Sequence, residues 1–416
     1  MPGTAISTSG AGLLVLVPAW PWAASSFFVS TGRGVPILNR LRGTRDGISF
    51  LVGIFRMRMA IACMAFFFVV GCGEKVFYLG EAGTPMRTAI GVGPEPPLQL
   101  LWERQLDGAP LGGVVFAGSL ALQLSTSPSL HAYDRHTGAK FGKKSYDELA
   151  CGPGALAGEL FLLAVQGGEP GLLAMDRRTL KERWFHPGSF CRAAAVSGDT
   201  LLVVDEKGTI DVLRASDGEA LWQVALEQRV RVGVTVGEDL LFAGTNEGTL
   251  FALALADGDE KWRQELGEAL RSRPLPDGDR IFTATASGKV VAVASDDGEV
   301  LWQQALGGLL TEDLAVGAGT LVAGCVDRHI YGLDTATGEV RWSFETEGVV
   351  RSSPAITGQT AYCAASDGYL YALELDSGRL LWKYKVNGPV LAPVVLYEGL
   401  LGVVSEERTL YIFGRR

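Results

Sequence analysis

A regular spacing of tryptophans constrains the fold of this 416-residue chain more than any other feature of its sequence. Tryptophans stand at 102, 184, 222, 262, 302, 342 and 382, and the last five are each 40 residues apart. The gap from Trp102 to Trp184 is about two periods, and Phe141 lies near its middle. Self-similarity at this period indicates a repeat architecture forming one domain, not several unrelated domains.

Each forty-residue unit also repeats its turn signals and its short apolar runs. Five of the tryptophans follow a turn glycine by four residues, as Trp262 follows Gly258, and an apolar run such as TLFAL precedes each turn. Another turn, such as Asn246-Glu247-Gly248, precedes most of these runs. Glycine adopts positive φ at little cost, so Asp-Gly and Asn-Gly between apolar runs are strong hairpin signals. The pattern predicts four short antiparallel strands in each unit and leaves no room for helices.

A small residue precedes most of the aromatic positions by ten residues. Ala174, Ala252, Ala292, Gly332 and Ala372 fill this place, and Ala132 stands nine residues before Phe141. Val212 precedes Trp222 by ten, and Ile412 holds the equivalent third-strand place in the last unit. A small side chain beside a large indole suggests complementary packing between neighbouring sheets. We therefore expect a structural role for the aromatic residues Trp102, Phe141, Trp184, Trp222, Trp262, Trp302, Trp342 and Trp382.

Four-stranded sheets that follow one another must bury both faces, and a radial arrangement around an axis does so. Third strands are expected near residues 130, 172, 210, 250, 290, 330, 370 and 410. The strand around Trp102 has no three strands before it and can close the ring by completing the last sheet. Residues 98–416 are therefore predicted to form an all-β, eight-bladed β-propeller.

The first 71 residues differ from the rest in charge. They hold six arginines and one aspartate, a net charge of +5, whereas the remaining residues hold 31 basic and 45 acidic side chains, a net charge of −14. Arg58 precedes an apolar run from Met59 to Val70, which is too short to span a bilayer but fits a signal peptide. Val69-Val70-Gly71-Cys72 then resembles a bacterial lipobox, which implies a signal peptide at 57–71 and lipidation of Cys72. The alternative is a buried apolar strand that ends in an ordinary cysteine.

Two segments flank this signal peptide. Because a lipoprotein signal peptide begins a chain, we expect residues 1–56 to be an upstream misread or a leader, with translation starting at Met57 or Met59. Residues 72–97 are rich in glycine and proline and have no helical or strand period. They are predicted to form a flexible tether between the anchor and the folded body.

The blade motif, seen in SDGYLYALELDSGRLLW (366–382) and DRHIYGLDTATGEVRW (327–342), resembles that of PQQ-like β-propeller repeats. With the lipobox before it, the chain is similar over residues 57–416 to the BamB family of outer-membrane lipoproteins. The resemblance implies a non-catalytic scaffold at the periplasmic face of the outer membrane, monomeric within a complex. Its implied partners are a BamA-like outer-membrane barrel assembly subunit and the substrates of that subunit. Three blades depart from the motif: Phe141 replaces tryptophan, Arg177–Leu180 lacks the turn glycine, and Glu406–Arg408 lacks the hairpin glycine.

Arginines recur nine residues after the tryptophans, where the innermost strands are expected to start. Arg231, Arg271 and Arg351 stand there, while the other blades carry Thr311, Leu391, Leu111, Ala150 and, with a two-residue deletion, Cys191. If inner strands line the channel, these arginines form a positive collar that Arg229 and Arg273 extend. Such a collar suits acidic protein segments, and the resemblance implies that Arg271 contacts the assembly partner. The alternative is pairing with rim carboxylates such as Glu312 and Asp313.

The composition argues against other classes of function. A net charge of −9 for the whole chain disfavours nucleic-acid binding, and the absence of Cys-x-x-Cys and His-x-x-x-His disfavours zinc. No catalytic residue, metal ligand or cofactor-binding residue is assigned. A quinoprotein dehydrogenase shares the repeat, but this chain has no Cys-Cys pair and no long insertion. A ligand-binding or sensor propeller remains a further alternative. For Cys151, Cys191, Cys325 and Cys363 we expect isolated buried cysteines rather than disulfides.

Overall fold

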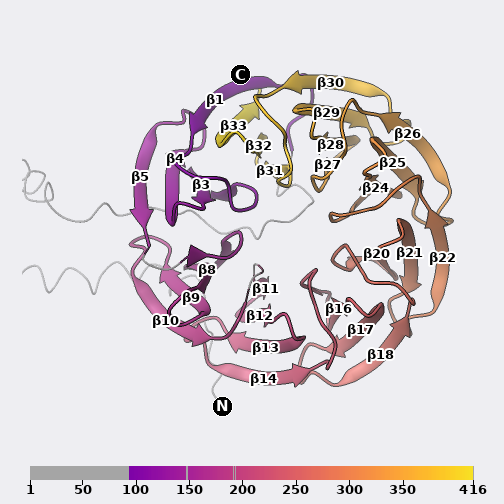
Figure 1. Ribbon diagram of the computed structural model, residues 1–416, viewed down its shortest axis with the longest axis horizontal. Helices are drawn as coiled ribbons and strands as arrows, with labels where there is room; N and C mark the ends of the chain where they lie inside the picture. The colour runs from indigo at the N-terminus through magenta and orange to yellow at the C-terminus, as the bar shows by residue number, and fades with distance from the viewer. Residues whose placement is uncertain (1–92, 147–148, 191, 193, 416) are drawn as a thin grey trace, which may run out of the picture. The chain divides into compact units, whose positions relative to one another are not determined.

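The computed structural model describes residues 93–415 apart from 147–148, 191 and 193. Its regular elements are all β-strands, and they form eight sheets arranged in a ring around an axis (Figure 1). The predicted all-β, eight-bladed propeller is therefore confirmed. The predictions for residues 1–92, including the signal peptide at 57–71 and lipidated Cys72, lie outside the described residues.

Consecutive strands pair antiparallel within each blade, from a short inner strand to an outer strand. Blade 1 contains β2 (Val115–Ala117), β3 (Leu120–Ser125), β4 (Ser129–Asp134) and β5 (Lys140–Ser145). Blade 2 contains β6 (Leu149–Ala150), β7 (Ala155–Ala157), β8 (Leu160–Gln166), β9 (Gly171–Asp176) and β10 (Glu182–Pro187), with both β6 and β7 on β8. Blade 3 contains β11 (Ala195–Ser197), β12 (Thr200–Val204), β13 (Thr209–Arg214) and β14 (Ala220–Ala225). Blade 4 contains β15 (Val234–Val236), β16 (Leu240–Gly244), β17 (Thr249–Ala254) and β18 (Glu260–Glu265).

The second half of the ring repeats this order with strands of nearly constant length. Blade 5 contains β19 (Leu275–Asp277), β20 (Arg280–Ala284), β21 (Lys289–Ala294) and β22 (Val300–Ala305). Blade 6 contains β23 (Ala315–Gly317), β24 (Thr320–Gly324), β25 (His329–Asp334) and β26 (Val340–Glu345). Blade 7 contains β27 (Ala355–Thr357), β28 (Thr360–Ala364), β29 (Tyr369–Glu374) and β30 (Leu380–Lys385). Blade 8 contains β31 (Val395–Tyr397), β32 (Leu400–Ser405) and β33 (Thr409–Gly414).

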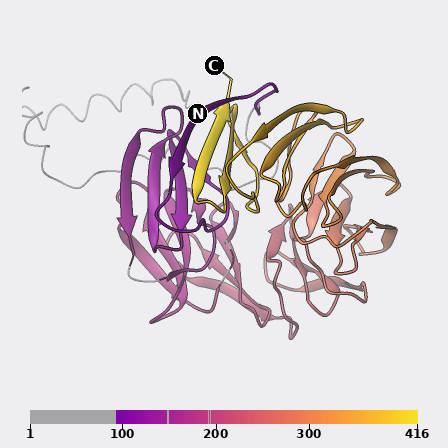
Figure 2. The same cartoon turned by 45° about the horizontal axis from the view of Figure 1, so that its top comes forward.

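The eighth blade is completed by β1 (Gln99–Gln105), the first strand of the described chain. It pairs antiparallel with β33, with Trp102 opposite Ile412, and the two strands lie side by side in Figures 1 and 2. The outer strand of blade 8 thus comes from the beginning of the propeller sequence. This closes the ring as predicted and leaves no blade incomplete.

The tryptophan repeat holds neighbouring blades together. Six of the seven propeller tryptophans donate an indole N–H hydrogen bond to a backbone carbonyl of the next blade, as Trp262 does to Ser295 at 3.0 Å. The indole also covers the turn glycine of that blade, since a Cβ built on Gly298 would lie 2.5 Å from Trp262. Gly298 has a φ of 77°, so its turn needs glycine for both its backbone conformation and its space.

The small residue ten positions before each tryptophan packs in a different place from the predicted one. Ala252 lies directly opposite Trp262 in the same sheet, and Gly332 lies opposite Trp342. The contact between sheets is made instead by the turn glycine. The physical reason is that residues paired across antiparallel strands have close side chains on one face, so the small residue makes room within its own blade.

In the irregular blades, other residues fill the repeat positions. In blade 1 the residue opposite Ala132 is Gly142, and the Phe141 side chain is 38% exposed, so Gly142 and not Phe141 stands at the indole position. In blade 2, Leu180 takes a positive φ of 53° at the turn place that is glycine in the other blades with this turn. At the hairpin place that is glycine in blades 3, 4, 5 and 7, Arg408 of blade 8 and Arg328 of blade 6 take positive φ values of 60° and 71°.

Residues 93–97, at the end of the expected tether, contact blade 7. The Gly93 N–H donates to Thr357 Oγ1 at 3.1 Å, and the Tyr362 hydroxyl donates to the Pro94 carbonyl at 2.7 Å. Leu98 is buried in the apolar core formed by blades 7 and 8. The segment that leads into β1 is therefore attached to the propeller before the first strand begins.

Candidate partner-binding site at the mouth of the channel

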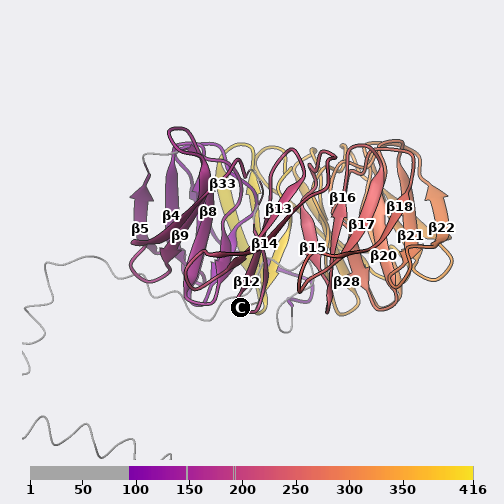
Figure 3. The ribbon, with the colours of Figure 1, turned by 90° about the horizontal axis from the view of Figure 1, so that it is seen from below.

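The strands run between two faces of the ring, as Figure 3 shows from the side. We call one the mouth face; it carries the loops between blades, such as 226–233 and 266–274, and the hairpins between second and third strands, such as 245–248. We call the other the turn face; it carries the turns between first and second strands and between third and fourth strands, such as 237–239 and 255–259. The predicted arginines all lie in the loops of the mouth face.

Backbone hydrogen bonds hold these loops in place. The Arg229 carbonyl accepts from the Asn246 N–H at 2.8 Å, and the Arg271 N–H donates to the Ala284 carbonyl at 2.8 Å. The loop before β27 is held in the same way, because the Val349 carbonyl accepts from the Ser366 N–H at 2.9 Å. The arginine side chains therefore project from a fixed backbone, which lowers the entropic cost of binding a partner.

Arg231, Arg271 and Arg351 are exposed at equivalent positions of blades 4, 5 and 7. Within the residues that the structure describes, none of the three takes part in an ion pair. The alternative prediction, pairing with Glu312 or Asp313, is not what the structure shows for these three side chains. Their positive charges remain available to an acidic group of another molecule.

The carboxylates near these arginines have other partners. Glu247 accepts from the Arg229 backbone N–H at 3.0 Å, and Asp367 accepts from the backbone N–H of Glu347 at 3.0 Å. Glu268 accepts from the Lys289 ammonium at 2.6 Å as well as from Thr285 and Ser287. These acids fasten hairpins to loops instead of neutralising the arginines.

Arginines of the turn face are paired instead. Arg214 contacts Asp217 and Glu219 at 2.8 Å each, and Arg379 contacts Glu374 at 2.8 Å. The contrast between the two faces matters because an exposed ion pair contributes little to stability but satisfies its charges locally. The three arginines without an ion pair among the described residues therefore lie on the mouth face, whereas Arg214 and Arg379 of the turn face have acidic partners.

Arg273 lies deeper, in the channel itself. It lines a cavity of about 250 Å³ to which all eight blades contribute, among them Gly113, Asp313 and Ser353. Its backbone N–H donates to Asp313 Oδ1 at 2.6 Å, its Nε donates to Asp313 Oδ2 at 3.2 Å, and the Asp313 N–H donates to Ser353 Oγ at 3.3 Å. Burial, and then repulsion by Arg192, lower the pKa of Arg273 to about 10. A polar chain thus joins blades 5, 6 and 7 around the channel.

The predicted collar is therefore displaced by two residues. Arg231, Arg271 and Arg351 do not line the channel, and they precede the inner strands β15, β19 and β27 instead of starting them. The residue that faces the channel comes two positions later, as Arg273 does. The intervening residue, Ser272, is buried. Its side chain points into the blade, where its Oγ accepts a hydrogen bond from the Ala284 N–H at 2.8 Å.

The mouth face also carries exposed apolar side chains. Leu149, in β6 of blade 2, and Leu309, in the loop before β23 of blade 6, are 57% and 49% exposed. Leu111 and Leu391 are half-buried at the positions equivalent to Arg271. Exposed apolar side chains next to cationic ones are typical of protein-binding surfaces. Leu111 and Leu391 occupy the same place in the repeat as the arginines, whereas Leu149 and Leu309 lie at other positions of the unit and were missed.

A second polar cluster, in blade 1, has residue types found in hydrolases. Asp107 Oδ1 lies 2.8 Å from His131 Nε2, and Ser129 Oγ lies 3.2 Å from the same nitrogen. A catalytic triad uses the two ring nitrogens for the acid and the nucleophile separately, so this arrangement lacks the required relay. Burial would raise the pKa of Asp107, but hydrogen bonds from Lys143, His131 and Ser125 outweigh it and hold that pKa well below its usual value. The cluster fastens a loop to a hairpin, as Glu268 does in blade 5.

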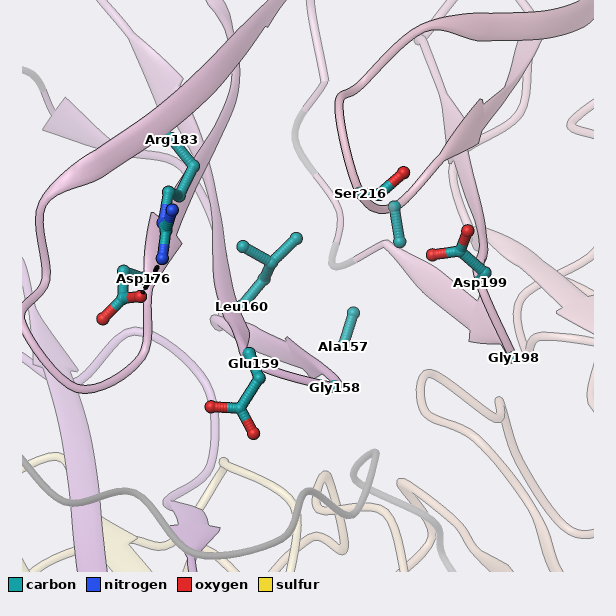
Figure 4. A pocket seen from close by; sticks show the side chains of 10 residues that line it. Ala157, Gly158, Glu159, Leu160, Asp176, Arg183, Gly198, Asp199 and Ser216 are labelled. Atoms are coloured by element: carbon teal, nitrogen blue, oxygen red, sulfur yellow. Dashed lines mark hydrogen bonds and ion pairs between the residues drawn. The ribbon is translucent and has the colours of Figure 1, made fainter. Parts of the chain in front are cut away.

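The turn face has a groove of about 420 Å³ between blades 2 and 3, shown in Figure 4. Glu159 and Asp176 lie on one side of it, and Asp199 and Ser216 on the other. Asp176 accepts from Arg183 at 2.6 Å, which lowers the pKa of Asp176 well below its usual value, and Glu159 accepts from Arg177. Since two of its three acids are already paired, the groove offers little uncompensated charge.

The cysteines divide into two kinds. Cys325 and Cys363 are free and buried, and burial raises the pKa of Cys325 to about 11 and that of Cys363 to about 12, so neither is a reactive thiolate. Cys151 is disulfide-bonded, which overturns the expectation of isolated cysteines at this position. Cys191 lies outside the described residues.

In the described part of the chain, no three His, Cys, Asp or Glu side chains are grouped so as to hold a metal ion. The same residues contain no helix long and apolar enough to cross a membrane.

Comparison with known proteins gives one family and several similar structures. A family model described as outer membrane protein assembly factor BamB matches residues 99–218, 206–308 and 286–413. The crystal structure of BamB from Moraxella catarrhalis superposes with a TM-score of 0.65 at 18% identity, covering 76% of this chain and 100% of that one. A computationally designed protein, Ika8, has a TM-score of 0.68 at 15% identity, with 76% and 100% covered. A europium-containing methanol dehydrogenase has a TM-score of 0.62 at 13% identity, with 76% and 93% covered. The comparison with curated protein sequences gives no match.

Proposed function

This chain is a member of the BamB family, and on that premise we propose that it is a non-catalytic scaffold for the assembly and insertion of outer-membrane β-barrel proteins. Its partner is a BamA-like assembly subunit, and the substrates of that subunit are barrel precursors. Cys72 carries the lipid anchor that holds the propeller at the periplasmic face of the outer membrane. Family membership supports a role in outer-membrane protein assembly, and the mouth face is the surface that we propose binds the partner.

The observation that carries the proposal is the set of unpaired arginines Arg231, Arg271 and Arg351. They project from fixed loops, the nearby acids Glu247, Glu268 and Asp367 bind other groups, and Leu149 and Leu309 add exposed apolar area to the same face. An acidic loop of the partner that also carries apolar side chains would match this surface.

Charge reversal tests the proposal. In full-length protein, Arg271→Glu combined with Arg351→Glu is expected to weaken copurification and crosslinking with the outer-membrane barrel subunit by about tenfold or more, because each reversal places like charges at the interface. Arg379→Glu is the matched control, since Arg379 is exposed on the turn face. Unchanged binding by the double variant would remove the arginine surface from the proposal, and the absence of any barrel protein among the crosslinked partners would overturn the assembly role.

A second candidate function is that of a ligand-binding or sensor propeller, and the channel cavity with Arg273 and Asp313 favours it. A scan of small carboxylates by calorimetry would support this reading if binding were lost in Arg273→Ala. The fold shared with a methanol dehydrogenase concerns architecture alone, at 13% identity. A calcium-reconstituted quinone-binding assay tests the dehydrogenase alternative directly.

A further inference from the structure

The outer strands of the eight blades form the perimeter of the ring, and their charge differs from one side of the ring to the other (Figures 1 and 3). Six of these strands contain as many basic as acidic side chains, or none of either kind: β1, β10, β14, β18, β22 and β26. The other two are basic, because β5 contains three lysines, β30 contains two, and neither contains an acid.

The two basic strands lie on either side of β1, so the excess positive charge belongs to the consecutive blades 7, 8 and 1 (Figure 1). We call the outer strands β30, β1 and β5 the basic edge. Lys140, Lys383 and Lys385 are exposed on it and form no ion pair among the described residues. Lys383 and Lys385 lie 4.9 and 4.5 Å from the centroid of the Tyr369 ring. A neutral ring attracts a cation without cancelling its charge, so these lysines can still bind an anion.

The basic edge contains little acid and some exposed apolar surface. Glu103 is the one acidic residue in its three strands, and Lys143 is paired with Asp107 of the following loop. Phe141 and Leu380 lie beside the lysines and are 38% and 37% exposed. Lysines combined with exposed aromatic and aliphatic side chains are typical of surfaces that lie at the headgroups of a bilayer.

The chain enters the propeller at the same part of the ring. Gly93 and Pro94 are hydrogen-bonded to Thr357 and Tyr362 of blade 7, and Leu98 is buried in the core of blades 7 and 8 before β1 begins. Twenty residues lie between Cys72 and Gly93. An anchor at Cys72 therefore pulls on the propeller through blades 7 and 8, whose perimeter reaches a bilayer with the least extension of the residues in between.

We propose that the basic edge is a membrane-facing surface that binds the anionic headgroups of a phospholipid bilayer. The ring then stands on its perimeter, and its mouth face stays open to a protein partner. This inference rests on one part of the proposed function, the lipid anchor at Cys72, and does not depend on the partner.

The charge of the whole propeller does not prevent this contact. Residues 72–416 carry a net charge of −14, so an anionic bilayer repels the body as a whole and favours the orientation that presents its basic side. At physiological ionic strength charges interact over only about 8 Å, so the lysines nearest the headgroups decide the orientation. The anchor holds the edge at high local concentration beside the bilayer, so a few lysines are sufficient.

The test uses the full chain in vesicles that carry a fluorescent acceptor lipid. A donor dye is attached at Ser145→Cys or at Ala305→Cys, which are the exposed last residues of β5 and β22 on opposite sides of the ring (Figure 1). In vesicles of equal parts phosphatidylglycerol and phosphatidylcholine, the dye at 145 is expected to transfer about twofold more energy than the dye at 305, because anionic lipid attracts the basic edge. With phosphatidylcholine alone this difference should be smaller.

Charge reversal shows whether the lysines cause the difference. Lys140→Glu combined with Lys383→Glu is expected to abolish it. The matched control is Lys207→Glu combined with Lys261→Glu, which changes the net charge equally at exposed lysines of blades 3 and 4 that have no ion pair among the described residues. The control should keep the difference, and circular dichroism with thermal unfolding verifies that both double variants fold.

Three results would overturn the inference: equal energy transfer at the two positions on anionic vesicles, a difference that survives Lys140→Glu with Lys383→Glu, or an equal loss in the control. Equal transfer, together with weaker copurification of a barrel protein by the same variant, would assign the basic edge to a protein partner instead.

The anchor and the partner surface are tested separately. Failure to attach to phosphatidylcholine vesicles would overturn lipidation at Cys72, while the difference between the dyes on anionic vesicles still decides the role of the basic edge. Arg271→Glu with Arg351→Glu, which tests the partner surface, should leave that difference unchanged.

Discussion

Six of the seven propeller tryptophans serve two blades at once. Each indole stacks on the turn glycine of the next blade, and its N–H bonds to the carbonyl three residues before that glycine, as Trp262 does with Ser295 and Gly298. Within its own blade the same ring lies opposite a small residue, Ala252. One side chain thereby fixes the distance and the angle between neighbouring sheets, and its position in the sequence repeats with the blade.

Replacing a turn glycine beneath an indole tests this contact. Gly298→Ala is expected to destabilise the protein by about 2–4 kcal/mol, because alanine is strained at positive φ and its Cβ collides with the Trp262 ring. Gly278→Ala is the matched control, since Gly278 has a φ of 59° with no atom within 4 Å of the added Cβ; it should cost about 1 kcal/mol from backbone strain alone. Denaturant unfolding measures both, and equal losses would contradict the proposed role of the indole.

At the scale of the element, every hairpin on the mouth face must be joined to the loop beside it. The blades achieve this with different residues: Asp107 with His131 at the start of the ring, Glu268 with Lys289 in blade 5, and Asp367 with the Glu347 N–H in blade 7. Each of these contacts joins a hairpin to the loop beside it. Because the side chains differ from blade to blade, each contact taken alone resembles an independent polar site.

The Glu268 contact predicts a pH dependence. Hydrogen bonds from Lys289, Ser287 and Thr285 lower the pKa of Glu268 from 4.5 to about 2. The folded state thus favours the ionised acid, so its contribution to stability is full above pH 4.5 and is lost as the pH falls towards 2. Glu268→Gln should lower stability at neutral pH and make the decline over this acidic range shallower, as followed by thermal unfolding at several pH values.

Glu299→Gln is the control for this experiment, because the exposed Glu299 side chain forms no hydrogen bond or ion pair within the described residues. An acid profile that is the same for Glu268→Gln and the unaltered protein would show that the contact with Lys289 does not contribute to stability.

At the scale of the whole molecule, stability depends on the closure of the ring by β1. Trp102 is buried, donates to the Arg135 carbonyl at 2.9 Å and covers Gly138, so it links blade 8 to blade 1. In a closed ring the last blade packs against the first, so neither blade has a sheet face left open to solvent. A curved stack of sheets would leave one such face at each end.

Trp102→Ala is therefore expected to destabilise the protein by about 3–5 kcal/mol, through loss of a large buried side chain. Limited proteolysis with mass spectrometry should then show earliest cleavage near β1, since the ring opens there. Trp382→Ala is the comparison: Trp382 is only half-buried, and within the described residues its indole N–H has no hydrogen-bond acceptor, so its loss should cost less. Greater sensitivity at Trp382 than at Trp102 would contradict the closure argument.

The strand content, the number of blades and the closing strand could all be predicted from the amino-acid sequence. This was possible because each blade is built from about forty consecutive residues, so the turn glycines and the tryptophans report contacts that are local in the chain. For the same reason, the sequence placed Arg231, Arg271 and Arg351 close to the inner strands of blades 4, 5 and 7, although they lie in the loops before those strands.

Which of those residues face the channel, and which arginines have no acidic partner, depends on how the loops fold in three dimensions. The path of the loop before β19 places Arg273 in the channel and Arg271 outside it, and strand periodicity does not describe that path. Arg273 meets Asp313 across 40 residues of sequence, while Arg271 and Arg351 meet no acid among the described residues. In the same way, the register of β5 places Gly142 and not Phe141 opposite Ala132. Pairing and orientation depend on distances between blades, which the repeat alone does not contain.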